Sequence, residues 1–540
     1  MAETFDYVIA GGGTAGCLLA FRLSDNKKNT VCVLEAGPPD NNPYIRIPAG
    51  FTKTIHDPAL TWQLDTEPSA TLNGRSIRLT QGRTLGGSSA INGMCFNRGH
   101  AIDYDSWAQL GNRGWSYSDV LPYFKRIETR IGPGDDKFRG RSGPIPVTTF
   151  AWQHPLVTAL IEGAEQIGIP RNPDYNGNGE EFGGAGRFQH NIKNGWRVSS
   201  AHAFLHPARK KNGVSVRTDA RASRILVENN RAVGVEYISY DRSGNSEPVT
   251  VMARKGVIVS SGVVNSPKLL QLSGIGPAEL LREKGIKVVH ALPGVGENFR
   301  DHFGGRLKTR LKNTDSINMR VKGIRLAGEI LKWAIGQPSV VALGPAIVHA
   351  FGRTKGAELP EYVLLCSPAS FKMDLSGLDD FPGMTIGAYS MRPLSEGYVR
   401  IASNDPRVPP TFQPNYLDHE YDKRMALAAA RDARRLMQTP ALKPYFDTEL
   451  NPGSQIQSDD ELLDFIRAMG QSSYHFSGTC KMGPSTDPKA VVDDQLRVHG
   501  MDGLYVVDAS IMPQPPSSNT MVPTLMIAEK ASDMMLRNTK

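Results

Sequence analysis

The chain of 540 residues carries 62 Lys and Arg against 54 Asp and Glu, which gives a formal net charge of +8. This mild basic balance comes without aromatic residues interleaved among the basic ones, so we expect no nucleic-acid partner. Five scattered cysteines without a C-x-x-C pair indicate a reducing compartment and no disulfide framework. No signal peptide precedes the first expected strand and no run of about 18 apolar residues occurs, so we expect a cytoplasmic protein without membrane-spanning helices.

The first predicted unit is a strand, a glycine turn, a helix and a second strand over residues 5–37. Gly11, Gly13 and Gly16 have G-x-G-x-x-G spacing directly after the apolar run at 7–10. The first glycine allows a tight bend, the second lets the backbone approach a pyrophosphate, and the third lets the helix sit close to the strand. Because a helix N-terminus offers unpaired N–H groups to phosphates, the unit predicts a nucleotide site.

Glu35 follows the second apolar run, at 31–34. An acid at this place can bond both hydroxyls of an adenosine ribose, and it would repel the 2′-phosphate of NADP. NAD and FAD both use this unit, so these residues alone leave the choice between the two open.

Residues 82–94 form a second glycine-rich segment, GRTLGGSSAINGM. Glycines and hydroxyls at this density predict a backbone-rich loop that can wrap a flat polar ligand. The interleaved Leu85, Ile91 and Met94 predict that the loop is anchored rather than freely flexible.

The rest of the chain divides into segments with different residue patterns. Alternating apolar and polar runs at 213–260 predict strands. Residues 303–470 have fewer glycines and mix helical with strand-like runs, which predicts a second domain. Helices are expected within 100–150, at 154–168, 320–336, 420–437 and 458–468, and from about residue 524.

Segment 320–336 (RVKGIRLAGEILKWAIG) predicts an amphipathic helix. Two interpretations stay open. The helix packs on its own domain and rims the entrance to a ligand site, or it lies on a membrane surface and makes the protein peripheral to the inner membrane. The apolar residues of one helical face are Val321, Ile324, Ala327, Ile330, Leu331 and Ala334.

Five motifs in order give the chain a resemblance to the glucose–methanol–choline (GMC) oxidoreductases, which are FAD flavoproteins. Besides the N-terminal unit and the loop at 82–92, they are NSPKLLQLSGIG at 265–276, PGVGENFRDH at 293–302 and the stretch 474–527. The similarity covers nearly the whole chain and is greatest to bacterial choline, L-sorbose and polyethylene-glycol dehydrogenases and furfuryl-alcohol oxidases. At Val263 the family usually has a smaller residue, and we expect only local repacking there.

The resemblance implies an α/β fold with an α+β second domain. A discontinuous Rossmann-type FAD-binding domain is expected over 1–150, 190–302 and 480–540. The substrate-binding domain, an antiparallel sheet with helices, is expected over 151–189 and 303–479.

The resemblance also implies FAD as the cofactor. No histidine stands at 90–92, where some members attach FAD, so we expect FAD to be bound non-covalently. The residues expected to hold it are Gly11, Gly13, Thr14, Ala15, Gly16, Glu35, Ala36, Arg83, Leu85, Gly86, Ser89, Asn92, Gly93, Met94, Ala222, Asp508, Ala509, Thr520 and Met521.

His475 and Asn519 are the expected catalytic residues, at positions where the family carries a histidine and a histidine or asparagine. Oxidising an alcohol removes the hydroxyl proton and passes the α-hydride to flavin N5. A neutral imidazole suits the first task, and the amide N–H₂ of Asn519 can hold the alkoxide. His302 and His499 stand in family motifs and are expected to be structural. No zinc motif, nucleophile elbow or P-loop occurs, so no metal site is expected.

The chain is therefore expected to be an FAD-dependent alcohol dehydrogenase or oxidase for a small primary or secondary alcohol, such as a sugar or glycol. A quinone or dye acceptor is favoured over oxygen. Two alternatives stay open: an oxidase that makes hydrogen peroxide from oxygen, and a lyase or decarboxylase with the same fold. The sequence does not indicate the oligomeric state.

Overall fold

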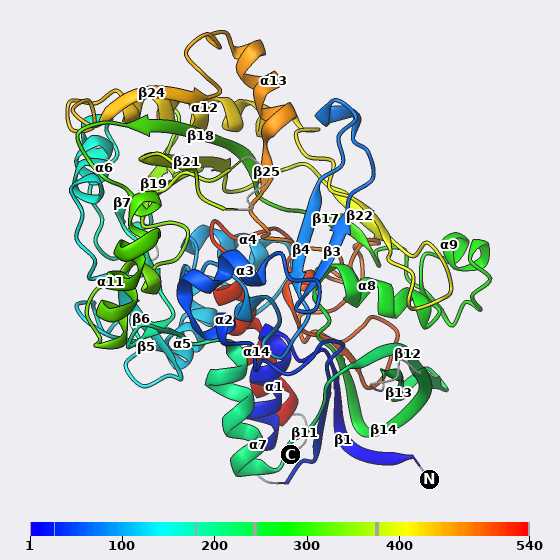
Figure 1. Ribbon diagram of the computed structural model, residues 1–540. Helices are drawn as coiled ribbons and strands as arrows, with labels where there is room; N and C mark the ends of the chain where they lie inside the picture. The colour runs from blue at the N-terminus through cyan, green and yellow to red at the C-terminus, as the bar shows by residue number, and fades with distance from the viewer. Residues whose placement is uncertain (1, 26–27, 179–180, 241–245, 373–376, 538–540) are drawn as a thin grey trace.

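The computed structural model describes residues 2–25, 28–178, 181–240, 246–372 and 377–537, which fold around two large sheets (Figure 1). The first sheet has the order β11-β2-β1-β14-β13-β12, and β26 also pairs with β14. Its strands are β1 (Glu3–Ala10), β2 (Val31–Leu34), β11 (Ser215–Arg217), β12 (Ala220–Glu228), β13 (Arg231–Tyr240), β14 (Ser246–Val259) and β26 (Leu504–Val506). β11, β2, β1, β14 and β26 are parallel, as in a nucleotide-binding sheet, and β12 and β13 add an antiparallel ribbon.

β14 is one continuous strand of 14 residues within the stretch 213–260, where the sequence predicted strands. Its first half pairs with β13, its last residues pair with β26, and most of its length pairs with β1. A single strand therefore joins the antiparallel ribbon to the parallel part of the sheet.

Helices α1 (Thr14–Ser24), α5 (Tyr117–Ile127) and α14 (Met521–Arg537) pack together in the core of the first sheet. An ion pair of 2.7 Å between Arg22 and Glu529 joins α1 to α14. α14 begins at Met521, slightly before the expected start near 524. The last helix of the chain thus supports the first one, and it brings the segment before Met521 to the nucleotide unit.

The second sheet is antiparallel, with the order β24-β18-β21-β20-β19-β7 and with β25 paired to β18. Its strands are β7 (Gly184–Arg187), β18 (Phe303–Leu311), β19 (Val348–Gly352), β20 (Tyr362–Ser367), β21 (Gly383–Ser390), β24 (Phe446–Asn451) and β25 (Gln471–Ser472). α12 (Glu420–Met437) lies on β18, β20 and β21, and its buried alanines allow the close approach. α13 (Asp459–Met469) begins at the capping box of Ser458.

The sequence placed α12 and α13 correctly but did not suggest β18. Two glycines and three basic residues interrupt the alternation of this strand, FGGRLKTRL. Pairing with β21, β24 and β25 imposes the strand conformation there, so tertiary context overrides a weak local pattern.

Smaller elements connect the two sheets and cover their edges. They are α2 (Pro43–Arg46), α3 (Phe51–Thr54), β3 (Thr61–Asp65), β4 (Arg78–Gly82), α4 (Ala101–Gln109), β5 (Glu128–Arg130), β6 (Ile145–Thr149), α6 (Pro155–Gln166), β8 (Gln189–His190), β9 (Ile192–Lys193), β10 (Trp196–Arg197), α7 (His206–Asn212), α8 (Gly262–Leu272), β15 (Ile275–Gly276), α9 (Ala278–Glu283), β16 (His290–Ala291), β17 (Glu297–Phe299), β22 (Gly397–Arg400) and β23 (Thr411–Gln413).

α10 (Ile317–Arg320) and α11 (Gly323–Ala334) form the predicted amphipathic segment. Of the two interpretations left open by the sequence, packing of the apolar face on the protein is wrong, because Ile324 and Leu331 are 89% and 63% exposed. The buried side chain of α11 is instead the charged Glu329. None of the helices in the described ranges is long and apolar enough to cross a membrane.

Candidate active site

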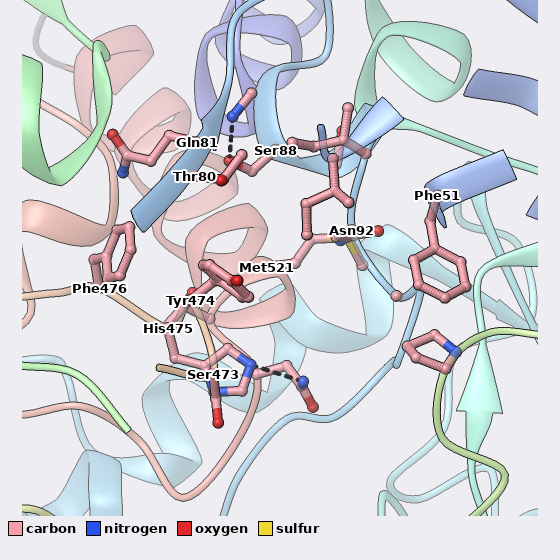
Figure 2. A pocket seen from close by; sticks show the side chains of 18 of the residues that line it. Phe51, Thr80, Gln81, Ser88, Asn92, Ser473, Tyr474, His475, Phe476 and Met521 are labelled. Atoms are coloured by element: carbon pink, nitrogen blue, oxygen red, sulfur yellow. Dashed lines mark hydrogen bonds between the residues drawn. The ribbon is translucent and has the colours of Figure 1, made fainter. Parts of the chain in front are cut away.

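A cavity of about 850 Å³ is lined by residues of both sheets and of the loops between them. In Figure 2 the side chains of His475, Met521, Asn92 and Phe51 surround this space. Four segments that are far apart in sequence meet here: the glycine turn, the loop at 82–94, β18 with its neighbours, and the stretch before α14.

The glycine turn brings the N-terminus of α1 to the cavity. A Cβ on Gly16 would lie 1.9 Å from the Gly11 carbonyl oxygen, and one on Gly11 would lie 2.3 Å from that of Ser260, so neither position admits a side chain. Gly13 is the N-cap of α1 and supplies no side-chain cap. The N–H groups of the first turn are therefore available to a ligand, and a pyrophosphate fits them.

Glu35 lines the cavity at the end of β2 and is buried. Its carboxylate accepts hydrogen bonds from the backbone N–H groups of Gly12 (2.9 Å) and Gly37 (2.8 Å), which fix its position. Burial raises the pKa of Glu35 to about 7, although the two N–H bonds oppose the shift. A fixed carboxylate beside a phosphate site fits the ribose hydroxyls of an adenosine nucleotide.

The loop at 82–94 folds tightly against the glycine turn. The N–H of Gly86 donates to the Gly12 carbonyl over 2.8 Å. A Cβ on Gly87 would lie 2.8 Å from Gly13 Cα, so the two backbones are in contact. The turn and the loop together form a backbone-walled groove that suits a pyrophosphate and the flat ring next to it.

Asn92 marks the other end of this groove. Its Oδ1 accepts a hydrogen bond from Arg197 Nη1 (2.7 Å), and its Nδ2 lies 3.1 Å from Met521 Sδ. Met94 adopts a positive φ of 61°, which turns the chain along the cavity wall. Asn92, Met94 and Met521 all line the cavity, in keeping with an expected place beside a flavin ring.

Most residues that the sequence assigned to FAD line this cavity. Gly16, Arg83, Leu85 and Gly86 do not: they lie behind the turn and the loop and support them. Those that line it are Gly11, Gly13, Thr14, Ala15, Glu35, Ala36, Ser89, Asn92, Gly93, Met94, Ala222, Asp508, Ala509, Thr520 and Met521.

Sequence reasoning missed the residues that follow β14. Ser260, Ser261 and Gly262 line the cavity, and Asp508 Oδ2 accepts hydrogen bonds from the Gly262 N–H (2.8 Å) and Ser266 Oγ (2.6 Å). A usable signal was present, because ligands bind at the carboxyl ends of parallel strands.

His475 and Asn519 lie together at the cavity wall, as the sequence suggested. Asn519 Nδ2 is 2.9 Å from His475 Nε2, a contact drawn as a dashed line in Figure 2. On the other side of the ring, His475 Nδ1 is 2.9 Å from His302 Nδ1, and His302 Nε2 is 2.7 Å from the Met391 carbonyl oxygen. Four residues thus form one chain of hydrogen bonds that ends at the cavity.

The direction of these hydrogen bonds follows from chemistry. A carbonyl oxygen only accepts, so His302 Nε2 carries the proton and its Nδ1 is an acceptor. Burial lowers the pKa of His302 to about 4, which keeps that ring neutral. His475 Nδ1 must therefore donate, and the lone pair of His475 lies on Nε2, towards the cavity and Asn519. Burial, with a smaller contribution from His302, holds the pKa of His475 well below its usual value.

Asp301 holds the backbone of His475. Its Oδ1 accepts the His475 N–H (2.8 Å), and its Oδ2 accepts the hydroxyls of Tyr416 and Ser472. Burial raises the pKa of Asp301 to about 7 against the effect of these hydrogen bonds. His302, expected to be structural, is in direct contact with His475, and His499 lies elsewhere, 3.0 Å from the Gly483 carbonyl oxygen.

Asp40, His202 and His206 lie close together outside the cavity, with possible ligand atoms within 4.8 Å of one another. The sequence predicted no metal site, and motif reasoning could not see this group because Asp40 is remote from the histidines. His206 Nε2 is 3.0 Å from Asp40 Oδ2. The contacts attach the loop after β2 to the start of α7.

Comparison with protein families gives a match to GMC oxidoreductase over most of the chain. The N-terminal GMC oxidoreductase family model matches residues 5–304, and the C-terminal one matches 393–528.

Two of the most similar relatives are named oxygen-dependent choline dehydrogenase. The protein of Brucella anthropi is 39% identical over 535 residues, 99% of this chain and 96% of the relative. That of Photobacterium profundum is 37% identical over 543 residues, 100% of this chain and 94% of the relative.

Solved structures show the same fold. Pyridoxine 4-oxidase from Mesorbium loti superposes with a TM-score of 0.86 at 31% identity, covering 98% of both chains. Formate oxidase superposes with a TM-score of 0.92 at 25% identity, covering 99% of both chains. A fungal aryl-alcohol oxidase, at 22% identity and a TM-score of 0.86, shares the fold.

The matched family models and the identity over the full length lead to the same assignment. The chain belongs to the GMC oxidoreductases, FAD-dependent enzymes that act on CH–OH groups.

Proposed function

We propose that the protein oxidises an alcohol, with His475 as the base and Asn519 as the group that holds the alcohol oxygen. The observation that carries the proposal is the hydrogen-bond chain from the Met391 carbonyl through His302 to His475, which leaves an unprotonated Nε2 at the cavity wall. A neutral imidazole nitrogen in a largely apolar cavity wall is a suitable acceptor for a hydroxyl proton.

Binding of the alcohol requires one exchange of partners. Asn519 Nδ2 donates to His475 Nε2 in the structure. An alcohol hydroxyl that donates to Nε2 takes over this acceptor, and the Asn519 N–H is then available to the alcohol oxygen. The amide stabilises negative charge on that oxygen as the proton moves to His475. Bound FAD supplies the hydride acceptor for the oxidation.

Non-covalent attachment of FAD is part of the proposal. Ala90, Ile91 and Asn92 offer no histidine to the ring, and burial raises the pKa of the nearby Cys95 thiol to about 12, which disfavours the thiolate. Acid precipitation of the protein should release all flavin into the supernatant. Flavin retained in the pellet would contradict this part.

Anaerobic mixing with an alcohol tests the reaction class. In an oxidoreductase the alcohol should reduce the flavin, and the absorbance of oxidised flavin at about 450 nm should then be lost. A lyase or decarboxylase with the same fold would convert its substrate without lasting bleaching. The series should include sugars, glycols, aryl alcohols and choline, because relatives are named for choline and a solved neighbour for aryl alcohols.

We further propose that α11 lies on a lipid surface and that a quinone in that surface accepts the electrons. Val321 and Leu326, on the inner side of this segment, line the cavity, whereas Ile324 and Leu331 face solvent. Exposed apolar stripes of this kind mark interaction sites.

The surroundings of α11 favour a membrane over a protein partner. Trp333 packs on Trp196 with ring centroids 4.4 Å apart, and Trp196 is 40% exposed. The Arg46 guanidinium lies 5.9 Å from the Trp196 ring. Aromatic rings with basic side chains beside an apolar stripe suit the headgroup region of an anionic bilayer.

The acceptor is tested by parallel assays of one enzyme sample. Ubiquinone in liposomes should be reduced faster than oxygen is consumed. The names of the relatives include the words oxygen-dependent, so fast oxygen consumption with release of hydrogen peroxide is the competing outcome, and it would overturn the quinone proposal.

A further inference from the structure

Arg306, on β18, lines the cavity. Among the residues that the structure describes, no side chain or carbonyl accepts a hydrogen bond from it or forms an ion pair with it. Burial lowers its pKa, and only Tyr474 among the charged or titratable groups interacts with it electrostatically. Arg306 is partly exposed to the cavity, so its guanidinium, which has no counter-charge among the described residues, is available to an anion from outside the protein.

Arg306 stands on the same face of the chain as His302, the partner of His475. His302 directly precedes β18, and Gly304 and Arg306 follow it at alternate positions, which in an extended chain point the same way. β18 also pairs with β25, the two-residue strand just before His475. Arg306 lies four positions after His302, a distance of roughly 13 Å along an extended backbone.

One glycine leaves space beside the Arg306 side chain. Gly387 is the cross-strand partner of Arg306 on β21. A Cβ on Gly387 would meet nothing closer than 3.8 Å, so the space beside the guanidinium is open. A ligand of moderate size can thus reach from His475 to Arg306.

The remaining charges leave the substrate side of the cavity positive. The carboxylates among the described lining residues are Glu35 and Asp508, and both are bonded within the nucleotide half. Lys308, two residues beyond Arg306, is neutralised by Asp379 at 3.1 Å. Arg306 is therefore the unpaired charge on β18 that a substrate can bind. Among the lining residues that the structure describes, no carboxylate on this side of the cavity would bind a cation.

The rest of the substrate side is apolar. Leu326, Phe371 and Phe465 line it together with Ile317, Val321 and Met469. This lining suits a hydrocarbon or an aromatic ring between the two polar ends of a ligand.

We propose that Arg306 binds a carboxylate of the substrate, so that the alcohol oxidised is a hydroxy acid with an apolar or aromatic body rather than a quaternary ammonium alcohol such as choline. The planar guanidinium pairs with a carboxylate through two parallel N–H···O bonds and fixes the far end of the substrate. The hydroxyl then reaches His475. The inference rests on the proposed alcohol oxidation for the position of that hydroxyl.

Inhibitor binding tests the inference without any turnover. The FAD-loaded enzyme is titrated with benzoate and with benzamide, two molecules of the same shape, and binding is followed by the change in flavin absorbance. Benzoate should bind at least about tenfold more tightly, since hydrogen bonds to charged groups contribute about 1.5–3 kcal/mol. Equal binding of the two by the unaltered enzyme would overturn the proposal, whatever the variants do.

Variants of two β18 residues test whether Arg306 causes the preference for benzoate over benzamide. Arg306→Met should abolish it, and Arg306→Lys should keep only part of it because an ammonium lacks the two-pronged geometry. Lys308→Met removes the same charge from the same face of β18 and should leave the preference intact. A preference that survives Arg306→Met, or falls equally in Lys308→Met, would overturn the assignment to Arg306.

A substrate pair separates this inference from the proposed function. 4-(Hydroxymethyl)benzoate should bleach the flavin with a kcat/KM at least about tenfold above that of its amide. If benzoate binds through Arg306 but no alcohol bleaches the flavin, alcohol oxidation fails and the carboxylate site stands. If the amide and choline react as well as the acid, the carboxylate site fails and alcohol oxidation stands.

Discussion

His302 and His475 meet through their Nδ1 atoms, 2.9 Å apart, so a single proton lies between the two rings. The Met391 carbonyl forces that proton to belong to His475, because His302 must use its own proton on Nε2. His302 therefore sets which nitrogen of His475 is the unprotonated one at the cavity. Tyr389 stacks on His302 with ring centroids 5.1 Å apart and keeps it in place.

His475→Ala should keep FAD and lose most of the reaction. General bases contribute about 10²–10⁴-fold, and this variant also loses the ring that positions the alcohol. Anaerobic stopped-flow measurement of flavin reduction at saturating alcohol gives the rate. His290→Gln, a change outside the cavity, is the matched control and should leave the rate unaltered. Bleaching of His475→Ala at the wild-type rate would remove His475 as the base.

His302 is a positioning residue, and its replacement should show in the pH profile. The base works when neutral, so activity is lost as pH falls through the pKa of His475. Burial, and to a smaller extent His302, hold that pKa well below 6.5, so the acidic limb of the wild-type profile should lie far below that pH. In His302→Ala the pKa rises and the limb moves up towards neutrality.

His302→Gln separates this effect from a loss of folding. A glutamine can still accept from His475 and donate to the Met391 carbonyl, so it should restore part of the rate of flavin reduction. An acidic limb at the same pH in the wild type and in His302→Ala would contradict the role given to His302.

Asn519→Ala should lower kcat by about 10²-fold, since the loss of one donor to a developing oxyanion costs about this much. Asn519→His keeps a donor at the position and should retain more activity than the alanine variant. Steady-state kinetics with one alcohol measures both. Equal rates for Asn519→Ala and the wild type would show that the amide does not hold the alcohol oxygen.

Glu35 should make FAD binding depend on pH. Its pKa of about 7 means that the carboxylate of the empty protein is largely protonated at pH 6 and largely ionised at pH 8. The ionised form accepts both ribose hydroxyls, so affinity for FAD should rise by about tenfold over this interval. Titration of flavin-free protein with FAD, followed by quenching of flavin fluorescence, measures the rise.

Glu35→Gln should flatten that pH dependence. The raised pKa also affects the folding stability of the flavin-free protein, in the opposite direction. The neutral acid stabilises the folded protein fully below about pH 4.3, and this contribution is lost as pH rises through 7. Thermal unfolding of the flavin-free wild type and variant at pH 6 and 8 checks this second effect. An unchanged FAD affinity between pH 6 and 8 would contradict the ribose role.

The parts of the candidate site that could be predicted from the sequence are those formed by short motifs. Gly11 to Glu35 could be interpreted because every residue of a nucleotide turn has its own steric or hydrogen-bonding task. His475 and Asn519 could be predicted because the resemblance includes the segments that carry them. Their contact, at 2.9 Å, depends on α14 packing against α1, which no local pattern shows.

Other parts were beyond sequence reasoning for a physical reason. β18 is held as a strand by its partners, so neither the strand nor the direction of Arg306 appears in its local pattern. The sequence left the direction of the apolar face of α11 open, because periodicity shows that an apolar stripe exists and only burial shows whether it points inward. Glu329 occupies the inward position, with Lys332 Nζ at 2.9 Å and the Val340 N–H at 3.0 Å.

The exposed stripe of α11 should bind anionic vesicles, and charge on the stripe should prevent it. The double variant Ile324→Asp with Leu331→Asp changes two exposed side chains, so the fold should be unaffected. Each aliphatic side chain buried in lipid contributes about 1.5–3 kcal/mol, so partitioning should fall by more than tenfold. Lys322 and Lys332 are weaker positions for this test, since they already pair with Asp380 and Glu329.

Sedimentation with liposomes containing phosphatidylserine measures the partitioning. Leu110→Asp, at an exposed leucine after α4, is the matched control because it adds the same charge at an apolar surface position away from α11. It should sediment like the wild type. Absence of wild-type binding would reject the membrane contact, and so would equal binding of the double variant, because α11 carries the exposed apolar side chains on which the contact is proposed to rest.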